Sequence, residues 1–138
     1  MTTKSSGFTL IELLVVIAII GILSAAGTIT YSGYVKGAKR NSAENVIQQI
    51  SLAQTEEYSN TGSYYITGGD TSCSADATST QGIETNLFDG ESIIDDDIDF
   101  EVCIFGTGAN YTVSAQDTTS TCVITVTKYG TPERTNCN

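Results

Sequence analysis

The apolar residues of the chain are concentrated near its N-terminus. A polar segment, residues 1–7, is followed by a strongly apolar stretch, and no charged residue occurs between Glu12 and Lys36. As a helix, these 23 uncharged residues would extend about 34 Å, which exceeds the roughly 30 Å of a hydrocarbon core. Residues 8–30 are therefore predicted to cross a membrane as the first part of a helix.

The next section of the chain has the pattern of an amphipathic helix. Apolar residues recur at helical spacing, and polar residues occupy the other positions. The apolar set is Ala43, Val46, Ile47, Ile50 and Ala53, and the polar set is Glu44, Gln48, Gln49, Gln54 and Glu56. Turn-forming residues follow at 60–63, so the helix is expected to end near Ser59. One helix over residues 8–59 is predicted, with its second half packed against a sheet.

Residues 60–138 are expected to form a small globular head. Residues 62–90 are rich in Ser, Thr, Gly and Asp, which predicts a long, mostly irregular connection. Three segments rich in β-branched or aromatic residues, 100–105, 111–115 and 122–128, predict strands joined by short links. The expected fold is α+β, with a long N-terminal α-helix packed on a small antiparallel β-meander.

The head carries a strong negative charge. The whole chain has a formal net charge of -10, but after Asn41 fifteen acidic residues stand against only Lys128 and Arg134, a net of -13. Such a surface repels phosphate backbones, so direct nucleic-acid binding is not expected. The run Asp95–Asp99 could offer oxygen ligands to calcium, but it lacks the spacing and the glycine of an EF-hand loop. A solvated acidic loop is favoured, and neither a metal nor another cofactor is expected.

No catalytic constellation is recognisable in the sequence. The chain has no histidine, no Gly-x-Ser-x-Gly motif and no phosphate-binding glycine loop. Its Ser and Thr clusters lie in the expected connection, without a base to activate them. The chain is therefore not expected to be an enzyme.

All four cysteines, Cys73, Cys103, Cys122 and Cys137, lie in the head. A head of roughly 80 residues has a marginal core, and small domains in oxidising compartments commonly add disulfides. A zinc site would need four thiolates at spacings unlike the usual paired cysteines. Structural disulfides are expected, and the residues alone leave all three possible pairings open.

The order of the first residues disfavours an ordinary secretory signal peptide. Such a peptide has a positive region, then a short apolar core, then a cleavage site of small residues. Here an acidic residue, Glu12, stands almost at the start of the apolar stretch. A carboxylate inside a bilayer costs about 3 kcal/mol, so Glu12 is a candidate functional residue that needs a cationic partner. The only cation near it in the sequence is Lys4.

The segment from Gly7 to Leu13 reads GFTLIEL and resembles the processing motif of type IV prepilins. The resemblance implies that a prepilin peptidase cleaves between Gly7 and Phe8 on the cytoplasmic side and methylates the new N-terminal amine of Phe8. It also implies that the carboxylate of Glu12 pairs with the N-terminal amine of a neighbouring subunit during assembly. The short leader, residues 1–7, and the phenylalanine after the cleavage point resemble the type IVa branch.

The resemblance continues to about Arg40. The stretch Tyr31–Lys36 is similar to the tyrosine-containing stretch that follows the membrane segment in type IVa pilins. Those pilins usually carry a proline two residues before the first tyrosine, where this chain has Ile29. Their helix is often unwound in the filament between a glycine such as Gly21 and that proline. Without the proline, the sequence leaves open whether the helix unwinds.

For the head, the resemblance favours the pairs Cys73–Cys103 and Cys122–Cys137, of which the second would tie back the C-terminal tail as in similar pilins. The implied function is that of a structural subunit of a type IV pilus, a helical filament of identical copies. The sequence leaves open whether the filament serves adhesion, twitching motility, DNA uptake, secretion or surface sensing. The precursor would lie in the bacterial inner membrane, with its head outside, before it joins the extracellular pilus. Two alternatives stay open, namely a pseudopilin of a type II secretion system and a minor or tip pilin in adhesion or DNA uptake.

Overall fold

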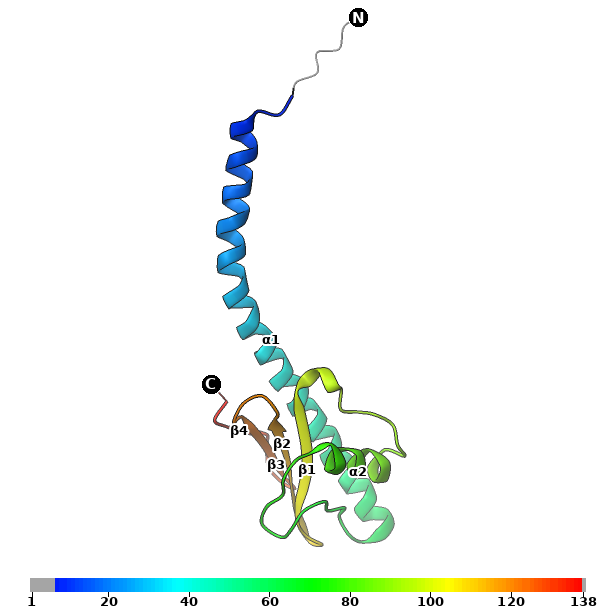
Figure 1. Cartoon of the computed structure of the whole chain (residues 1–138). Helices are drawn as coiled ribbons and strands as arrows, with labels where there is room; N and C mark the ends of the chain where they lie inside the picture. The colour runs from blue at the N-terminus through cyan, green and yellow to red at the C-terminus, as the bar shows by residue number, and fades with distance from the viewer. Residues whose placement is uncertain (1–6, 138) are drawn as a thin grey trace, which may run out of the picture. The chain divides into compact units, whose positions relative to one another are not determined.

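The structure is a computed structural model that describes residues 7–137, apart from the side chain of Ile29. Its elements are helices α1 (Leu10–Thr61) and α2 (Ala77–Leu87), the 3₁₀ helix η1 (Asp96–Ile98), and strands β1 (Phe100–Thr107), β2 (Asn110–Asp117), β3 (Val123–Thr127) and β4 (Glu133–Thr135) (Figure 1). The chain divides into two compact units, residues 1–37 and 38–138. Of the expected leader, residues 1–7, only Gly7 lies within the described residues.

The first unit contains the apolar part of α1, and the predicted long N-terminal helix is confirmed. The most apolar 18-residue window of α1 has a mean hydropathy of 2.6, and none of it is buried. By length and composition the helix can cross a membrane. Leu10 and Ile22 expose 82% and 72% of their surface, so these side chains need apolar surroundings from outside the chain. The helix runs through position 29 without interruption.

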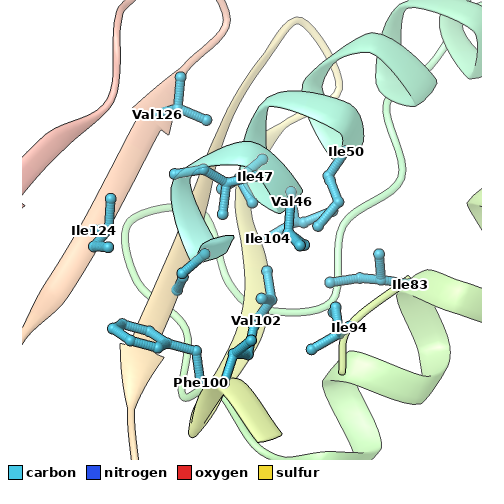
Figure 2. Packing of buried hydrophobic residues seen from close by; sticks show 14 of the residues in the cluster. Val46, Ile47, Ile50, Ile83, Ile94, Phe100, Val102, Ile104, Ile124 and Val126 are labelled. Carbon is cyan, nitrogen blue, oxygen red and sulfur yellow. The ribbon is translucent and has the colours of Figure 1, made fainter. Parts of the chain in front are cut away.

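The second half of α1 packs through the apolar stripe that the sequence predicts. Ala43, Val46, Ile47 and Ile50 are each at most 7% exposed, and they form one core with side chains of the sheet (Figure 2). The other core residues are Tyr64, Ile83, Ile94, Ile98, Phe100, Val102, Ile104, Tyr111, Val113, Ala115, Cys122, Ile124 and Val126. Each fully buried Val or Ile contributes about 1.5–3 kcal/mol, so this contact fixes the head on the helix.

The four strands form one antiparallel sheet in the order β1-β2-β3-β4, which confirms the predicted meander. In its register Val102 pairs with Ala115, and Ala115 pairs with Ile124. Cross-strand partners share a face, so these buried side chains point to the same side of the sheet. Strand β4 is not among the predicted strands. Its three polar, exposed residues carry no apolar alternation from which a strand could be inferred.

The structure corrects the expectation of a mostly irregular connection over 62–90, because α2 lies within it. At its start the Asp76 carboxylate accepts a hydrogen bond from the Ser79 N–H at 2.7 Å, and the Asp76 N–H donates to the Ser79 hydroxyl at 3.0 Å. This capping box satisfies two N–H groups. The helix is rich in Thr and contains Gly82, which are poor helix formers. Its stability comes from packing, since Ile83 is fully buried in the core.

From the sequence, Gln54 is predicted to lie on the polar face of the helix, and this prediction is wrong. Its side chain is 0% exposed. Its Nε2 donates a hydrogen bond to the carbonyl of Tyr65 at 2.6 Å, and its Oε1 accepts one from the Tyr65 N–H at 2.9 Å. The side-chain amide thereby satisfies both backbone groups of a residue in the connection after α1.

Replacing this amide is expected to destabilise the head. Gln54→Leu should lower the free energy of unfolding by about 2 kcal/mol, because both backbone groups of Tyr65 lose their partner. Urea unfolding of the detergent-solubilised chain, followed by circular dichroism, measures the loss. Gln48→Leu, at an exposed position of the same helix, is the matched control and should stay within about 0.5 kcal/mol of the unchanged chain. Equal losses in the two variants would contradict this role of Gln54.

Candidate functional site: the processing and assembly segment

The Gly7–Phe8 peptide bond lies before the first turn of α1, which begins at Leu10. Both residues are exposed, and Phe8 exposes 79% of its surface. A Cβ atom placed on Gly7 would meet no described atom within 4 Å. Because the bond lies outside the helical hydrogen-bond ladder and is not covered by other described residues, its backbone is available to an enzyme.

Glu12 is held at the start of α1 by a neighbour that sequence reasoning did not single out. Its Oε2 accepts hydrogen bonds from the Thr9 N–H at 2.8 Å and from the Thr9 hydroxyl at 2.6 Å. In return, the Glu12 N–H donates to Thr9 Oγ1 at 3.3 Å. This is a capping box, and the pattern Thr-x-x-Glu before an apolar run would have indicated it. Within the described residues the other carboxylate oxygen, Oε1, carries no hydrogen bond.

The surroundings of the Glu12 carboxylate are apolar. Together with Phe8, Ile11, Val15 and Val16 it lines a shallow groove of about 360 Å³. A negative charge on an otherwise hydrocarbon surface is unfavourable unless a cation meets it. The groove can therefore bind a group that has an apolar part to contact its walls and a positive charge to meet the Glu12 carboxylate.

The end of the apolar stretch carries two exposed aromatic residues and a cation. Tyr31 and Tyr34 expose 70% and 75% of their surface, and Lys36 is also exposed. Tyrosine is enriched at membrane–water interfaces, where its ring meets lipid and its hydroxyl meets water. The first unit thus has an acidic group at the start of its apolar stretch and an interfacial pattern at its end.

The structure contains the disulfides Cys73–Cys103 and Cys122–Cys137, and the expected pairing is confirmed. Their Cα atoms are 6.1 and 4.4 Å apart. The first joins the connection before α2 to the buried strand β1, and the second joins the start of β3 to the C-terminal tail. Each bond ties the two ends of a chain segment together and so limits the conformations of the unfolded chain.

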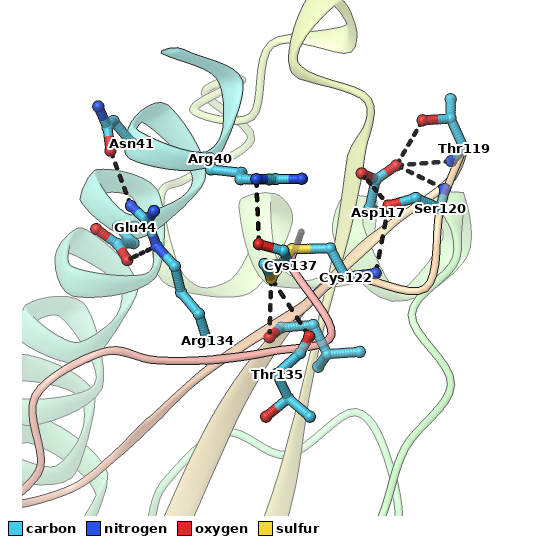
Figure 3. Close-up of a disulfide and its surroundings, with 11 residues drawn as sticks. Arg40, Asn41, Glu44, Asp117, Thr119, Ser120, Cys122, Arg134, Thr135 and Cys137 are labelled. Carbon is cyan, nitrogen blue, oxygen red and sulfur yellow. Dashed lines mark hydrogen bonds and ion pairs between the residues drawn. A yellow bond between two sulfur atoms is a disulfide. The ribbon is translucent and has the colours of Figure 1, made fainter. Parts of the chain in front are cut away.

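Polar contacts also hold the tail on α1, as Figure 3 shows. Arg134 donates to the Glu44 carboxylate at 2.6 Å and to the Asn41 side-chain oxygen at 2.8 Å. Arg40 donates to the carbonyl of Cys137 at 3.2 Å. One of the two head cations is therefore used to attach β4 to the helix.

The turn between β2 and β3 is built around Asp117 (Figure 3). Its carboxylate accepts hydrogen bonds from the Thr119 N–H at 2.7 Å and from the Ser120 hydroxyl at 2.6 Å. Burial alone would raise the pKa of Asp117, but the hydrogen bonds from Ser120 and Thr119 outweigh it and lower the pKa below its ordinary value. The charged form is therefore favoured in the folded head.

This lowered pKa predicts a loss of stability in acid. The folded head binds the proton of Asp117 less readily than the unfolded chain, so the contribution is present above about pH 4 and is lost as the pH falls through the lower folded pKa. Asp117→Asn should reduce the pH dependence of the free energy of unfolding below about pH 4. Ser120→Ala, which removes one donor, should have a smaller effect. An unchanged pH dependence in Asp117→Asn would contradict the prediction.

The acidic run Asp95–Asp99 makes one contact within itself and one with helix α1. Asp95 caps η1 by accepting a hydrogen bond from the Asp97 N–H at 3.1 Å, and Asp99 forms an ion pair with Lys39 of α1. Among residues 7–137, no group of three or more His, Cys, Asp or Glu side chains is arranged to hold a metal ion. The ion pair with Lys39 was not foreseen, because it joins residues far apart in the sequence.

The family model described as the prokaryotic N-terminal methylation motif matches residues 2–28. The chain is 42% identical over 64 residues to the type IV major pilin protein PilE1 of Neisseria gonorrhoeae, which covers 46% of this chain and 39% of that protein. It is 42% identical over 64 residues to a fimbrial protein of Neisseria meningitidis serogroup B, covering 46% and 38%. It is 46% identical over 56 residues to the fimbrial protein EcpC of Eikenella corrodens, covering 41% and 37%. No solved structure matches the chain.

The long helix that packs in its second half on a small antiparallel sheet has the layout of the type IV pilin fold. The methylation motif and the Neisseria relatives support a type IV pilin, which confirms the resemblance of the GFTLIEL segment. The matched region spans about two fifths of the length of these relatives. Their names are those of pilin and fimbrial proteins, which are structural subunits and not enzymes.

Proposed function

We propose that the chain is the precursor of a structural pilin subunit that is cleaved after Gly7, methylated on the amine of Phe8 and polymerised through its N-terminal helix into a type IV pilus. The observation that carries the proposal is the methylation motif, residues 2–28, which extends into an apolar helix whose side chains have no cover within the described chain. Such a helix needs lipid before assembly and other copies of itself afterwards. The relatives named as pilins and fimbrial proteins agree with this role.

The proposed steps rest on the resemblance to type IV prepilins, and the exposed position of the segment agrees with them. The precursor lies in the bacterial inner membrane, where a prepilin peptidase reaches the Gly7–Phe8 bond ahead of α1. Cleavage creates an N-terminal amine four residues before Glu12. The amine of one subunit and the Glu12 carboxylate of its neighbour are each unfavourable in an apolar filament core, and pairing them relieves both. Oε1 of Glu12, which lacks a hydrogen bond within the described residues, is the atom available for this pair.

Intact-mass spectrometry of protein sheared from the cell surface tests the proposal. The expected mass lacks residues 1–7, is raised by one methyl group and is lowered by four hydrogens for the two disulfides. Reduction should restore those four hydrogens. A processed form that stays in the inner membrane would favour a type II secretion pseudopilin, and trace amounts in a filament of another subunit would favour a minor pilin. An uncut N-terminus would contradict the proposal.

A further inference from the structure

Lys128, which directly follows β3, has an unusual environment for a lysine in so acidic a head. Its Nζ lies 4.9 Å from the ring centroid of Tyr64, 5.0 Å from that of Tyr129 and 5.6 Å from that of Tyr58. It also donates a hydrogen bond to the carbonyl of Ala109 at 3.2 Å. These distances are in the range of cation–π attraction. The ammonium group is therefore held in place by rings and by a carbonyl.

Within residues 7–137, no carboxylate forms an ion pair with Lys128, in contrast to Lys39 with Asp99 and Arg134 with Glu44. Hydrogen bonding to Tyr64 and Tyr129 raises the pKa of Lys128, so the group stays charged at neutral pH. Beside it, Tyr129 exposes 85% of its surface. Lys128, Tyr129 and Tyr58 together are called the lysine–tyrosine patch below.

The lysine–tyrosine patch lies at one end of the sheet. The N–H of Lys128 donates to Tyr111 at the start of β2, and its Nζ reaches Ala109 in the β1–β2 turn. At the other end of β1 lies the acidic turn, defined here as Asp95, Asp96 and Asp97, all exposed. Strand β1 has eight residues, so the two ends are about 26 Å apart. Figure 1 shows the β1–β2 hairpin and the turn before β1 at opposite ends of the sheet.

We infer that the lysine–tyrosine patch of one head binds the acidic turn of the next copy in the filament, an inference that rests on the proposed function. Residues 60–138 carry twelve acidic residues and two basic ones, a net of -10. Heads of this charge repel one another, so a favourable contact has to bring a cation to an acidic group. Asp99 is already paired with Lys39 and Asp95 caps η1, so Asp96 and Asp97 are the members of the run that are exposed and have no such contact among the described residues.

The positions of the two surfaces suit a filament. Complementary surfaces at opposite ends of one head give a head-to-tail contact, and such a contact repeats without closing when its rotation does not complete a ring. Tyrosine is also enriched at the energetic centre of protein interfaces. The copies would thus be joined through their heads in addition to their N-terminal helices.

A charge swap in the full-length chain tests the contact. Lys128→Glu should lower the yield of sheared filament about fivefold relative to the unchanged chain, because it places like charges against each other. Asp96→Lys/Asp97→Lys alone should also lower the yield. The two changes combined should restore most of it, because the contact is re-formed with its charges exchanged. Intact mass with both disulfides, and circular dichroism of the membrane pool, show whether each variant folds.

The control combines Lys128→Glu with Asp89→Lys/Glu91→Lys, which makes the same change in net charge at other exposed positions. The contact is supported if the filament yield recovers when Lys128→Glu is combined with Asp96→Lys/Asp97→Lys but not when it is combined with Asp89→Lys/Glu91→Lys. Equal recovery in both combinations, or a normal yield from a folded Lys128→Glu chain, overturns it. Failure of the unchanged chain to form any filament would instead overturn the proposed function, and the contact with it.

Discussion

Replacing Glu12 by glutamine is expected to lower the yield of surface filament at least tenfold while leaving cleavage and head folding intact. Glutamine keeps an oxygen that can accept the hydrogen bonds from Thr9, so the start of α1 is preserved. It removes the negative charge that would meet the N-terminal amine of a neighbouring subunit. Leaving that amine unpaired in an apolar environment costs about 3 kcal/mol, equivalent to roughly a hundredfold in an equilibrium constant.

The measurement is the amount of protein in the sheared fraction relative to the processed protein in the membrane. Glu12→Asp retains the charge on a side chain shorter by one methylene group, and it should assemble better than Glu12→Gln. Similar losses in the two variants would indicate that packing at this position, not charge, is what assembly requires. A normal yield of filament from Glu12→Gln would show that assembly does not need the carboxylate, which would contradict the proposed mechanism.

Removing the Cys73–Cys103 disulfide is expected to cost the head about 3.7 kcal/mol of unfolding free energy in the chain-entropy model. The bond closes a segment with a sequence separation of 30 residues, most of it outside the sheet. Cys73→Ala/Cys103→Ala leaves no unpaired thiol and removes the constraint on the unfolded chain. Against a total stability of about 5–15 kcal/mol for a small domain, this is a large fraction. Urea unfolding of the detergent-solubilised chain measures it.

Reduction provides the control for this variant. Under reducing conditions both chains lack disulfides, so the unchanged chain and Cys73→Ala/Cys103→Ala should unfold at nearly the same urea concentration. A difference that persists after reduction would mean that the loss comes from packing around Cys103, which is 0% exposed, and not from the cross-link.

Features that depend on neighbouring residues could be predicted from the sequence. The apolar stretch and the amphipathic stripe predict α1 because hydropathy and helical spacing are local properties. The predicted end near Ser59 lies close to the observed end at Thr61. The GFTLIEL segment indicated the methylation motif because its function resides in a short, contiguous set of residues. The three main strands were predicted from their β-branched and aromatic residues.

The errors concern residues whose role comes from distant partners. Gln54 has the polarity of a surface residue, and only the position of Tyr65 makes it a buried one. Helix α2 has weak local propensity and is stabilised by the burial of Ile83. Strand β4 has no apolar pattern and is held by β3, by Arg134 and by the disulfide at Cys137.

By itself, the sequence determined that this protein has a long apolar N-terminal helix, a methylation motif that contains an acidic residue, and an acidic, cysteine-bearing head. Charge, hydropathy and contiguous motifs depend only on the residues and their order along the chain, so they can be recognised without knowledge of the fold. The tertiary structure decided which cysteines meet, which polar side chains are buried and which carboxylates pair with Lys39 and Arg134. Each of these depends on distances between residues far apart in the sequence, and these distances exist only once the core has formed.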